Sequence, residues 1–316
     1  MASGYRARIE GALAVVTGAG SGIGRATAEA LSARGARVVA VDLDGDAAKR
    51  TASSCEGHAA SAGLDISERP AVEAFAGRAL GEWGCPDFLV NNAGVGMTGR
   101  FLDMSAADWD WIVGTNLLGA IHLTRAFGPA MLARRSGQVV NVASALTYLP
   151  RASEPGYVTT KSALVAWSRC LRADWGRVGV GVSVVCPGVT ATAIASSNTR
   201  YLGARADPEV REGIERRFAR GARPETVAAA VVDAIERDRA EVPVGLDARL
   251  ARLAHRLAPD AGSGRFGRRV AAAGRLAGTG RPARSVARSQ GLVASTGGHE
   301  GLHGSAAGPG RPGAAP

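Results

Sequence analysis

The sequence predicts an α/β fold built on a doubly wound parallel sheet of the Rossmann type. Short apolar, strand-like runs alternate with helix-like segments at least six times, and short links join them. This alternation calls for a parallel sheet with helices on both faces. In such sheets a ligand lies beyond the carboxyl ends of the strands. The residues that carry chemistry follow directly after the predicted strands and are Gly18, Asp42, Asp65, Asn91, Ser144 and Pro187.

Each predicted element follows from its local pattern of apolar residues. The run 13–17 is a strand that ends in a glycine cluster, and helix-like residues 25–33 follow until Gly35 stops them. Further strands are predicted over 37–41, 58–64, 87–90, 138–142, 180–185 and 241–245. Pro243 suits an edge position in the last of them. Further helices are predicted over about 45–53, 70–83, 106–134, 157–175 and 224–237.

Two stretches depart from this alternation. Residues 192–223 are polar and include a predicted helix over 208–220, so we interpret them as a flap over the site. From about Ala258 onward Gly, Ala, Arg, Ser and Pro dominate, and large apolar residues are scarce. Such a stretch cannot bury enough surface to offset its ordering entropy, so we expect it to be disordered. The predicted organisation is one domain over 1–257 followed by a basic tail over 258–316.

A short helix is predicted just before this tail. Leu250, Leu253 and Leu257 share one face of it, with arginines elsewhere. The leucine face could dock on the core, on a second subunit or on a membrane surface. Docking on protein is the simplest interpretation.

The net charge of +10 is unevenly distributed. The segment from Leu246 to the end has 11 Arg against three acidic residues, whereas the rest has 27 basic and 25 acidic residues. The basic tail could be a nucleic-acid arm, but Phe266 is its only aromatic residue for stacking on bases. A solvated extension is therefore favoured, and no nucleic-acid partner is expected.

Composition argues against several other classes of protein. The four cysteines form no CxxC pair, so we expect free thiols in a reducing cytoplasm and no metal site. The sequence contains no run of 18 or more uncharged apolar residues, which argues against a transmembrane helix. Residues 1–8 lack the apolar stretch of a signal peptide, so the predicted location is cytoplasmic.

The first glycine cluster points to a dinucleotide. Residues 17–24 read T-G-A-G-S-G-I-G between a strand and a helix, a spacing that differs from the common G-x-G-x-x-G fingerprint. Such a loop lets the backbone approach a pyrophosphate at the helix N-terminus. Asp42 ends the second strand, where its carboxylate can accept hydrogen bonds from ribose hydroxyls and would repel a 2′-phosphate. Because Leu43 and Ser21 are not basic either, NAD is preferred over NADP, with NADP still possible.

A second pattern points to acid–base chemistry. Tyr157 and Lys161 stand at i and i+4, so they lie on one face of the predicted helix. A free phenol has a pKa near 10 and is a poor base at neutral pH. A nearby ammonium favours the phenolate and lowers that pKa, which makes the pair a usable acid/base.

Together these motifs resemble the short-chain dehydrogenase/reductase family, in the subfamily with TGxxxGxG and YxxxK motifs. The resemblance covers residues 8–245, and the motifs occur in one order. Matching positions are Thr17, Gly18, Gly22 and Gly24 of the cofactor loop, Asp65, Asn91-Asn92-Ala93-Gly94, Asn116, Ser144, Tyr157, Lys161, Pro187, Gly188 and Thr192.

The resemblance implies an NAD(P)-dependent oxidoreductase that interconverts a secondary alcohol and its ketone by direct hydride transfer. Tyr157 would exchange a proton with the substrate oxygen, Ser144 would hydrogen-bond that oxygen, and Lys161 would bind the nicotinamide ribose and lower the pKa of Tyr157. Asn116 would hold a water that links Lys161 to solvent. The implied cofactor contacts are Gly18, Ser21, Gly22, Ile23, Gly24, Asp42, Leu43, Asp65, Ile66, Asn92, Ala93, Gly94, Tyr157, Lys161, Pro187, Gly188, Val189 and Thr192.

The main alternative is a non-catalytic relative that senses a dinucleotide on the same fold, but such proteins usually lose the Tyr, Lys or Ser. The substrate pocket should be lined by 145–150, 95–97 and 193–202. An apolar wall is expected there from Leu146, Tyr148, Leu149, Met97, Ile194 and Tyr201, which favours a hydrophobic alcohol or ketone as the substrate. Many family members end in a strand with a Gly-Gly pair that serves a tetramer interface. This chain has E-V-P-V-G instead, so a homodimer stands beside a homotetramer.

Overall fold

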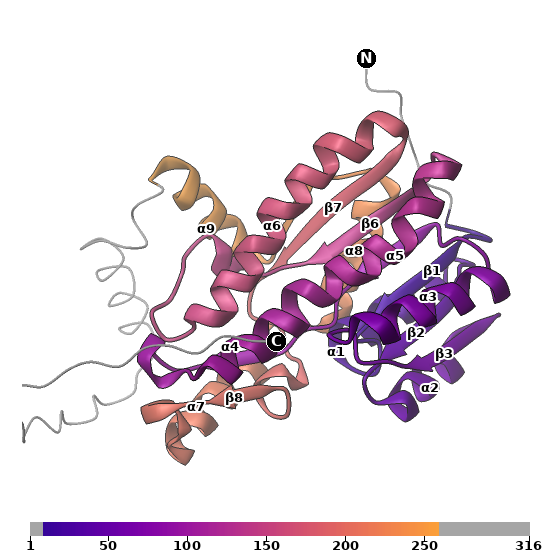
Figure 1. Ribbon diagram of the computed structural model, residues 1–316. Helices are drawn as coiled ribbons and strands as arrows, with labels where there is room; N and C mark the ends of the chain where they lie inside the picture. Colours follow the sequence, from indigo (N-terminus) through magenta and orange to yellow (C-terminus); the bar gives the residue numbers. More distant parts are fainter. Residues whose placement is uncertain (1–8, 259–316) are drawn as a thin grey trace, which may run out of the picture. The chain divides into compact units, whose positions relative to one another are not determined.

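A seven-stranded, fully parallel sheet forms the centre of the part of the chain that the computed structural model describes, residues 9–258 (Figure 1). The strand order β3-β2-β1-β4-β6-β7-β9 confirms the predicted doubly wound α/β fold. The predicted tail lies outside the described residues, apart from Ala258. The strands are β1 Leu13–Thr17, β2 Arg37–Asp42, β3 Ala59–Gly63, β4 Phe88–Asn91, β6 Gly137–Val142, β7 Val180–Pro187 and β9 Glu241–Val244.

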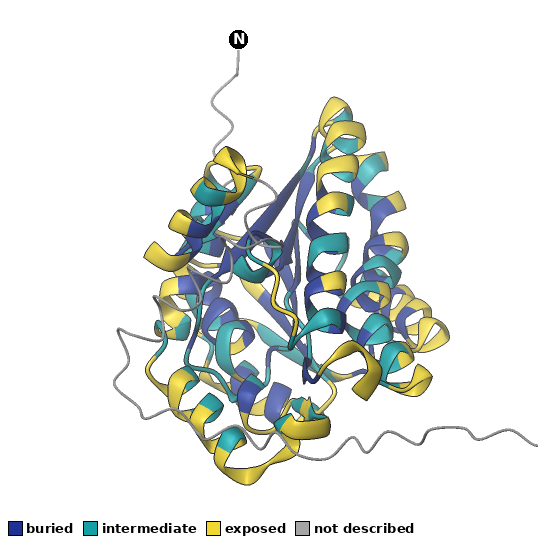
Figure 2. Ribbon diagram, turned by 90° about the vertical axis from the view of Figure 1, so that its left-hand side faces the viewer, coloured by how far each residue is buried: buried dark blue, intermediate teal, exposed yellow. Residues whose placement is uncertain are grey.

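The central strands are buried along their whole length. Every residue of β1, β4 and β6 is buried, since helices cover both faces of the sheet (Figure 2). This explains why these strands read as continuous apolar runs rather than as alternating patterns. β9 pairs only with β7 and forms an edge, where Pro243 removes no hydrogen bond from a second neighbour.

Two helical layers enclose the sheet. α1 Gly22–Ser32, α2 Gly45–Ser54 and α8 Pro224–Glu236 pack on one face, and α3 Arg69–Glu82, α5 Gly119–Arg134 and α6 Pro155–Trp175 pack on the other. On the second face the rings of Phe75 and Phe127 meet edge to face, with centroids 6.1 Å apart. No helix of the described chain is long and apolar enough to cross a bilayer.

The predicted helical stretch over 106–134 is confirmed, although it is not α-helical throughout. α4 spans Ala106–Val113, and a π-helical turn over Gly114–Leu118 separates it from α5. α4 begins at a capping box in which Ser105 and Asp108 bond to each other's backbone. The π turn contains Asn116, one of the predicted site residues, and single π turns often occur at functional sites.

The predicted flap has more regular structure than expected. It contains the 3-10 turns Ala193–Ala195 and Gly203–Ala206, strand β8 Thr199–Tyr201 and helix α7 Pro208–Ala219. β8 pairs in parallel with β5 Gly96–Thr98 in a two-stranded sheet that the sequence analysis did not predict. This pairing attaches the flap to the segment that follows β4.

The last helix, α9 Leu246–Leu257, turns its small residues toward the core. Ala248 and Ala251 are buried, whereas Leu250, Leu253 and Leu257 are 56%, 53% and 78% exposed. The possibility that the leucine face docks on the core is therefore wrong. The alanines allow close approach of the helix, and the leucines lie on its outer side.

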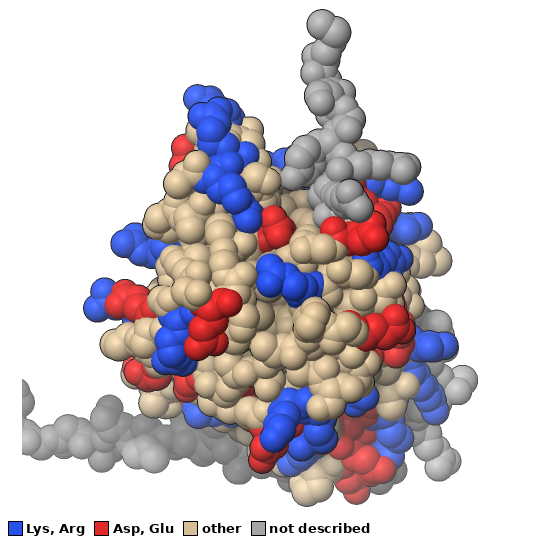
Figure 3. Space-filling model, turned by 90° about the vertical axis from the view of Figure 1, so that its right-hand side faces the viewer, with Lys and Arg blue, Asp and Glu red and all other residues tan. Residues whose placement is uncertain are grey.

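The surface of the described part carries charges of both signs. Figure 3 views the right-hand side of Figure 1 and shows Lys and Arg side chains interspersed with Asp and Glu side chains. Several oppositely charged residues of the described part form i,i+4 ion pairs on helices, such as Arg25 with Glu29 and Arg69 with Glu73. This agrees with the near balance of charges in the sequence before Leu246.

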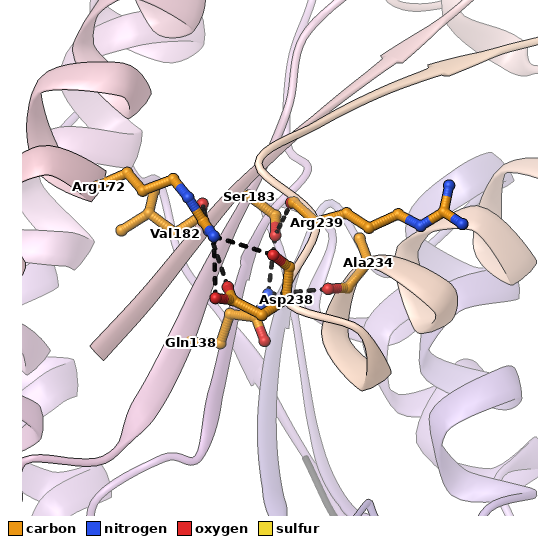
Figure 4. Close-up of polar contacts among 7 residues, drawn as sticks. All are labelled: Gln138, Arg172, Val182, Ser183, Ala234, Asp238 and Arg239. Carbon is orange, nitrogen blue, oxygen red and sulfur yellow. Dashed lines mark hydrogen bonds and ion pairs between the residues drawn. The ribbon is translucent and has the colours of Figure 1, made fainter. Parts of the chain in front are cut away.

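A polar network fastens α6 to the sheet (Figure 4). The guanidinium of Arg172 donates to both carboxylate oxygens of Asp238, at 2.8 and 2.9 Å, and to the carbonyl oxygen of Val182 at 2.7 Å. Asp238 adopts a positive φ of 45° in the turn between α8 and β9. Paired, charge-assisted hydrogen bonds of this kind fix geometry as well as adding stability.

Buried amide and hydroxyl groups extend this network under the sheet. Gln138 Nε2 donates to Ser183 Oγ at 2.8 Å and to the carbonyl oxygen of Ala234 at 3.0 Å, and Ser183 Oγ donates to the carbonyl oxygen of Arg239 at 2.5 Å. The network therefore joins β6, β7 and the end of α8.

We predict that Arg172→Met lowers the free energy of unfolding by roughly 1.5–3 kcal/mol, the usual contribution of hydrogen bonds to charged groups. Asp238 and the Val182 carbonyl oxygen would lose their partner, while the methionine would keep the apolar stem. Urea unfolding followed by circular dichroism measures the change. Arg177→Met is the matched control, because Arg177 is exposed and makes no side-chain hydrogen bond or ion pair with any described residue. Equal losses in both variants would contradict the prediction.

Candidate active site

A cavity of about 760 Å³ lies at the carboxyl ends of the strands. It opens where β1 and β4 are neighbours, the point at which the strand order reverses and where doubly wound sheets bind ligands. All but two of the predicted site residues line it. These are Gly18, Ser21, Gly22, Ile23, Asp42, Leu43, Asp65, Ile66, Asn92, Ala93, Gly94, Ser144, Tyr157, Lys161, Pro187, Gly188, Val189 and Thr192, and the two that do not line it are Gly24 and Asn116.

The glycine loop between β1 and α1 leaves no room for side chains. Gly18 has a φ of +63°, and a Cβ at Gly24 would overlap the carbonyl oxygen of Gly18. Gly24 therefore lets α1 pack against the loop and does not itself face the cavity. α1 has neither an acidic residue in its first turn nor a side-chain cap from Ser21, so its first N–H groups are open to an anion.

Asn92 joins this loop to the neighbouring strand. Its side-chain Nδ2 donates to the carbonyl oxygens of Thr17 at 2.8 Å and Gly18 at 3.2 Å, and its backbone N–H donates to Thr17 Oγ1 at 3.1 Å. These bonds fix the ends of β1 and β4 relative to each other. Asn92 thereby sets the shape of the cavity at the reversal point.

Acidic residues line the part of the cavity next to β2 and β3. Asp42 Oδ2 accepts a hydrogen bond from the backbone N–H of Gly20 at 2.8 Å, and Asp42 Oδ1 accepts one from Asp44 at 3.0 Å. Asp44 and Asp65 line the same part, and the described lining residues after these two strands include no Lys or Arg. This end is therefore unfavourable for a group with additional negative charge.

Ser144, Tyr157 and Lys161 meet at the opposite end. Ser144 follows β6, while Tyr157 and Lys161 are one turn apart on α6, with the Lys161 Nζ 5.9 Å from the centre of the Tyr157 ring. Burial raises the pKa of Tyr157 to about 12, although its hydrogen bond with Ser144 opposes this rise. Burial lowers the pKa of Lys161 to about 8, and its Nζ donates to the carbonyl oxygen of Val142 at 2.9 Å.

These pKa shifts define what the group can do. Tyr157 is protonated at neutral pH, so it is ready to donate a proton to a carbonyl oxygen. Acceptance of a proton from an alcohol requires the phenolate, which a charged Lys161 nearby stabilises. Ser144 can hydrogen-bond the same substrate oxygen because it already contacts the Tyr157 hydroxyl.

Asn116 lies behind this group rather than in the cavity. Its Oδ1 accepts a hydrogen bond from the Val95 N–H at 2.7 Å, and its Nδ2 donates to the Val95 carbonyl oxygen at 2.9 Å and to Thr160 Oγ1 at 3.3 Å. A Cβ at Gly94 would lie 3.1 Å from Lys161 Nζ and 3.2 Å from Asn116 Oδ1. Asn116 thus joins three segments next to Lys161, while its link to a water stays a prediction.

A second set of buried polar residues joins Asn91, which the sequence analysis named, to Asn141 and Ser168, which it missed. Asn91 Nδ2 donates to Asn141 Oδ1 at 2.9 Å, and Asn141 Nδ2 donates to Ser168 Oγ at 2.8 Å. All three side chains are buried and connect β4, β6 and α6 beneath the cavity. A polar residue inside the apolar run 137–142 was the available signal, because a buried amide needs a partner.

The prediction that Tyr148 lines the substrate pocket is wrong. Its hydroxyl donates to Glu241 Oε1 at 2.8 Å, away from the cavity lining. Glu241 also accepts hydrogen bonds from Arg169 at 2.8 Å and Arg252 at 3.0 Å. Burial pushes the pKa of Glu241 up, but the bonds from Arg169 and Tyr148 outweigh it and the pKa is lowered.

The remaining residues of the expected apolar wall do line the cavity. These are Met97, Leu146, Leu149, Ile194 and Tyr201. Further lining residues were not predicted, because nothing in their local sequence distinguishes them from surface residues. They include Trp111 on α4, Arg151 and Glu154 before α6, Ile214, Arg217 and Phe218 on α7, and Asp247 on α9.

The curated proteins that this chain resembles are named as oxidoreductases and dehydrogenases. The chain is 41% identical over 245 residues to the "probable oxidoreductase EphD" of Mycobacterium tuberculosis, which covers 75% of this chain and 41% of that protein. The chain thus spans about two-fifths of the length of this relative. It is also 35% identical to the "D-threitol dehydrogenase" of Mycolicibacterium smegmatis, over 71% of this chain and 86% of that protein.

Solved structures agree with this result. A short-chain dehydrogenase/reductase from Burkholderia phymatum in complex with NAD superposes with a TM-score of 0.70 at 32% identity, covering 79% of this chain and 95% of that one. A metagenomic short-chain oxidoreductase in complex with NADP superposes with a TM-score of 0.62 at 31% identity, covering 75% of this chain and 97% of that one.

The family model described as "short chain dehydrogenase" matches residues 12–202. This stretch is more than half of the chain and contains the glycine loop, Ser144, Tyr157 and Lys161. The chain therefore belongs to the short-chain dehydrogenase/reductase family.

Proposed function

We propose that this protein is an oxidoreductase that transfers a hydride directly between a nicotinamide cofactor and the carbon of a secondary alcohol or its ketone, with Tyr157 as the acid/base. The observation that carries the proposal is the meeting of Ser144, Tyr157 and Lys161 on the wall of the cavity that the glycine loop also lines. The alternative of a non-catalytic dinucleotide sensor is disfavoured, because the tyrosine, lysine and serine are all present and adjacent.

The residues divide the work of the reaction. In ketone reduction the Tyr157 hydroxyl donates its proton to the substrate oxygen, and the Ser144 hydroxyl donates a hydrogen bond that stabilises the charge developing on that oxygen. The positive charge of Lys161 lowers the free energy of the phenolate that remains. The bound cofactor supplies or accepts the hydride. In alcohol oxidation the same groups work in reverse.

The cofactor loop fits a dinucleotide. The N-terminus of α1 and the close backbone of the glycine loop would hold the pyrophosphate. Segment 187–192 and Lys161 would hold the nicotinamide half. Asp42 would accept hydrogen bonds from the adenosine ribose, and together with Asp44 it supports a preference for NAD, because a 2′-phosphate would meet like charges.

We further propose that residues 192–223 act as a flap over the substrate. The cavity is lined from this segment by residues on both β8 and α7, and β8 is hydrogen-bonded to β5 beside the catalytic group. One domain over 1–257, assembly as a homodimer or homotetramer and a cytoplasmic location stay predictions from the sequence.

The acid/base assignment predicts that Tyr157→Phe retains the fold and cofactor binding, because it removes only a hydroxyl. Turnover should fall by about 10²–10⁴-fold, the usual contribution of a general acid–base group. A screen of secondary alcohols and ketones, followed by the absorbance of the reduced nicotinamide, measures it.

Tyr148→Phe is the matched control for this experiment. It removes a phenol hydroxyl that bonds to Glu241 and does not line the cavity, so turnover should remain near that of the wild type. Near-normal turnover of the Tyr157→Phe protein would overturn the mechanism.

The charge of Asp42 predicts the cofactor preference. Wild-type protein should have a higher kcat/KM with NAD than with NADP. Asp42→Asn should reduce the ratio of kcat/KM with NAD to kcat/KM with NADP by roughly tenfold or more. The reason is that the Asp42 carboxylate and the 2′-phosphate are like charges, and like charges placed together at an interface cost several kcal/mol. Steady-state kinetics with both cofactors test this, with Asp46→Asn as a control for loss of a nearby charge outside the cavity lining. A wild-type preference for NADP would show that the assignment of Asp42 is wrong.

A further inference from the structure

Charged side chains interrupt the apolar wall of the cavity near the catalytic group. Arg151 and Glu154 lie in the loop between Ser144 and α6, and Arg217 lies on α7 of the proposed flap. The wall was expected to be apolar, whereas the exposed guanidinium groups of Arg151 and Arg217 offer hydrogen-bond donors to a ligand in the cavity.

Arg217 differs from the other arginines of the same helix. Arg211 pairs with Glu215 and Arg216 pairs with Glu212, both at i,i+4 spacing. The Arg217 guanidinium makes no hydrogen bond or ion pair with any residue from 9 to 258. It is also the only one of these three that lines the cavity. The unpaired donors of α7 therefore lie at the cavity wall.

The acidic groups near Arg217 form hydrogen bonds or ion pairs with other described residues. The pKa of Arg217 is lowered, first by burial and then by the like charge of Arg151. Glu154 Oε1 lies 3.8 Å from Arg151 Nη1, so this carboxylate already pairs with another guanidinium. Asp247 accepts hydrogen bonds from the backbone N–H groups of Val189 at 3.1 Å and Ala248 at 2.9 Å.

These neighbours place Arg217 close to the reacting end. Glu154 precedes Tyr157 by three residues, and its charge raises the pKa of Tyr157. Asp247 packs against Gly188, where an added Cβ would collide with the carboxylate. Arg217, Glu154 and Asp247 line the same cavity, and the charges of both acidic groups act on the Arg217 guanidinium. Apolar lining residues Ile214 and Phe218 flank it on α7.

We propose that Arg217, assisted by Arg151, binds an anionic group of the substrate, a carboxylate or a phosphate, while the neighbouring apolar side chains hold the rest of it. The substrate class is then an apolar hydroxy or oxo compound with an acidic group away from the reacting carbon. A guanidinium can hold such a group with two parallel hydrogen bonds, which orients the substrate as well as attracting it. This inference rests on the proposed hydride transfer.

Matched pairs of carbonyl compounds test the inference. Levulinate and longer oxo carboxylates are compared with their methyl esters, and dihydroxyacetone phosphate with dihydroxyacetone. The readout is the ratio of kcat/KM for the charged and uncharged members of each pair. Wild-type protein should prefer one kind of anion over its uncharged partner, and Arg217→Gln should reduce that ratio by roughly 10- to 100-fold through KM, as expected for loss of hydrogen bonds to a charged group. The two pairs distinguish a carboxylate from a phosphate.

Arg216→Gln is the matched control, because Arg216 is adjacent on α7, pairs with Glu212 and does not line the cavity. It should leave the ratio unchanged. Equal kcat/KM values for charged and uncharged members in the wild type, or equal losses in both variants, would overturn the inference while leaving hydride transfer intact.

Calorimetric binding of levulinate and of dihydroxyacetone phosphate to the NAD-loaded protein gives a second readout that does not need turnover. Binding that Arg217→Gln abolishes and Arg216→Gln retains supports the anion site. Absence of binding of both anions to the wild type would also overturn it. Failure to oxidise or reduce any compound, with anion binding present, would count against the proposed function instead.

Discussion

The hydrogen bonds that Asn92 donates to the end of β1 hold the two strands between which the chain reverses its path across the sheet. A parallel sheet cannot pair the backbone groups beyond its carboxyl ends, so the crevice there needs side chains to define it. The side-chain amide and the backbone N–H of Asn92 define the crevice by binding the end of β1. The glycine loop and the segment after β4 are joined at this junction.

α6 connects chemistry and stability within one helix. Its first turns carry Tyr157 and Lys161 in a buried environment that disfavours charge on either side chain. Near its other end, Arg172 is fixed to the turn after α8 by paired bonds to Asp238. A helix that must hold two ionisable groups in a desolvated site needs such an anchor, because small shifts of the helix would change their separation.

The sequence was informative where one local rule decides the structure. Buried strands such as β1 read as apolar runs, and the glycines of the first loop fit the close approach seen at Gly24. The π-helical turn at Asn116 was not predicted, although Gly114 and Gly119 flank this residue, because the Asn116 side chain bonds to the backbone of the distant Val95. Tyr148 was misplaced since its partner, Glu241, is 93 residues away. Arg217 looks like any arginine of a charged helix, and only the fold shows that it, unlike Arg211 and Arg216, has no ionic partner among residues 9–258.

The position of Asp247 makes α9 part of the site's architecture. Its carboxylate packs on Gly188 and accepts the N–H of Val189, so the segment after β7 and the last described helix share one contact. Arg252 of the same helix bonds to Glu241, which also holds the loop containing Tyr148. Because Asp247 bonds to the segment after β7 and Arg252 bonds to Glu241, the position of α9 is linked to the wall of the cavity, although among the described residues of this helix only Asp247 lines it.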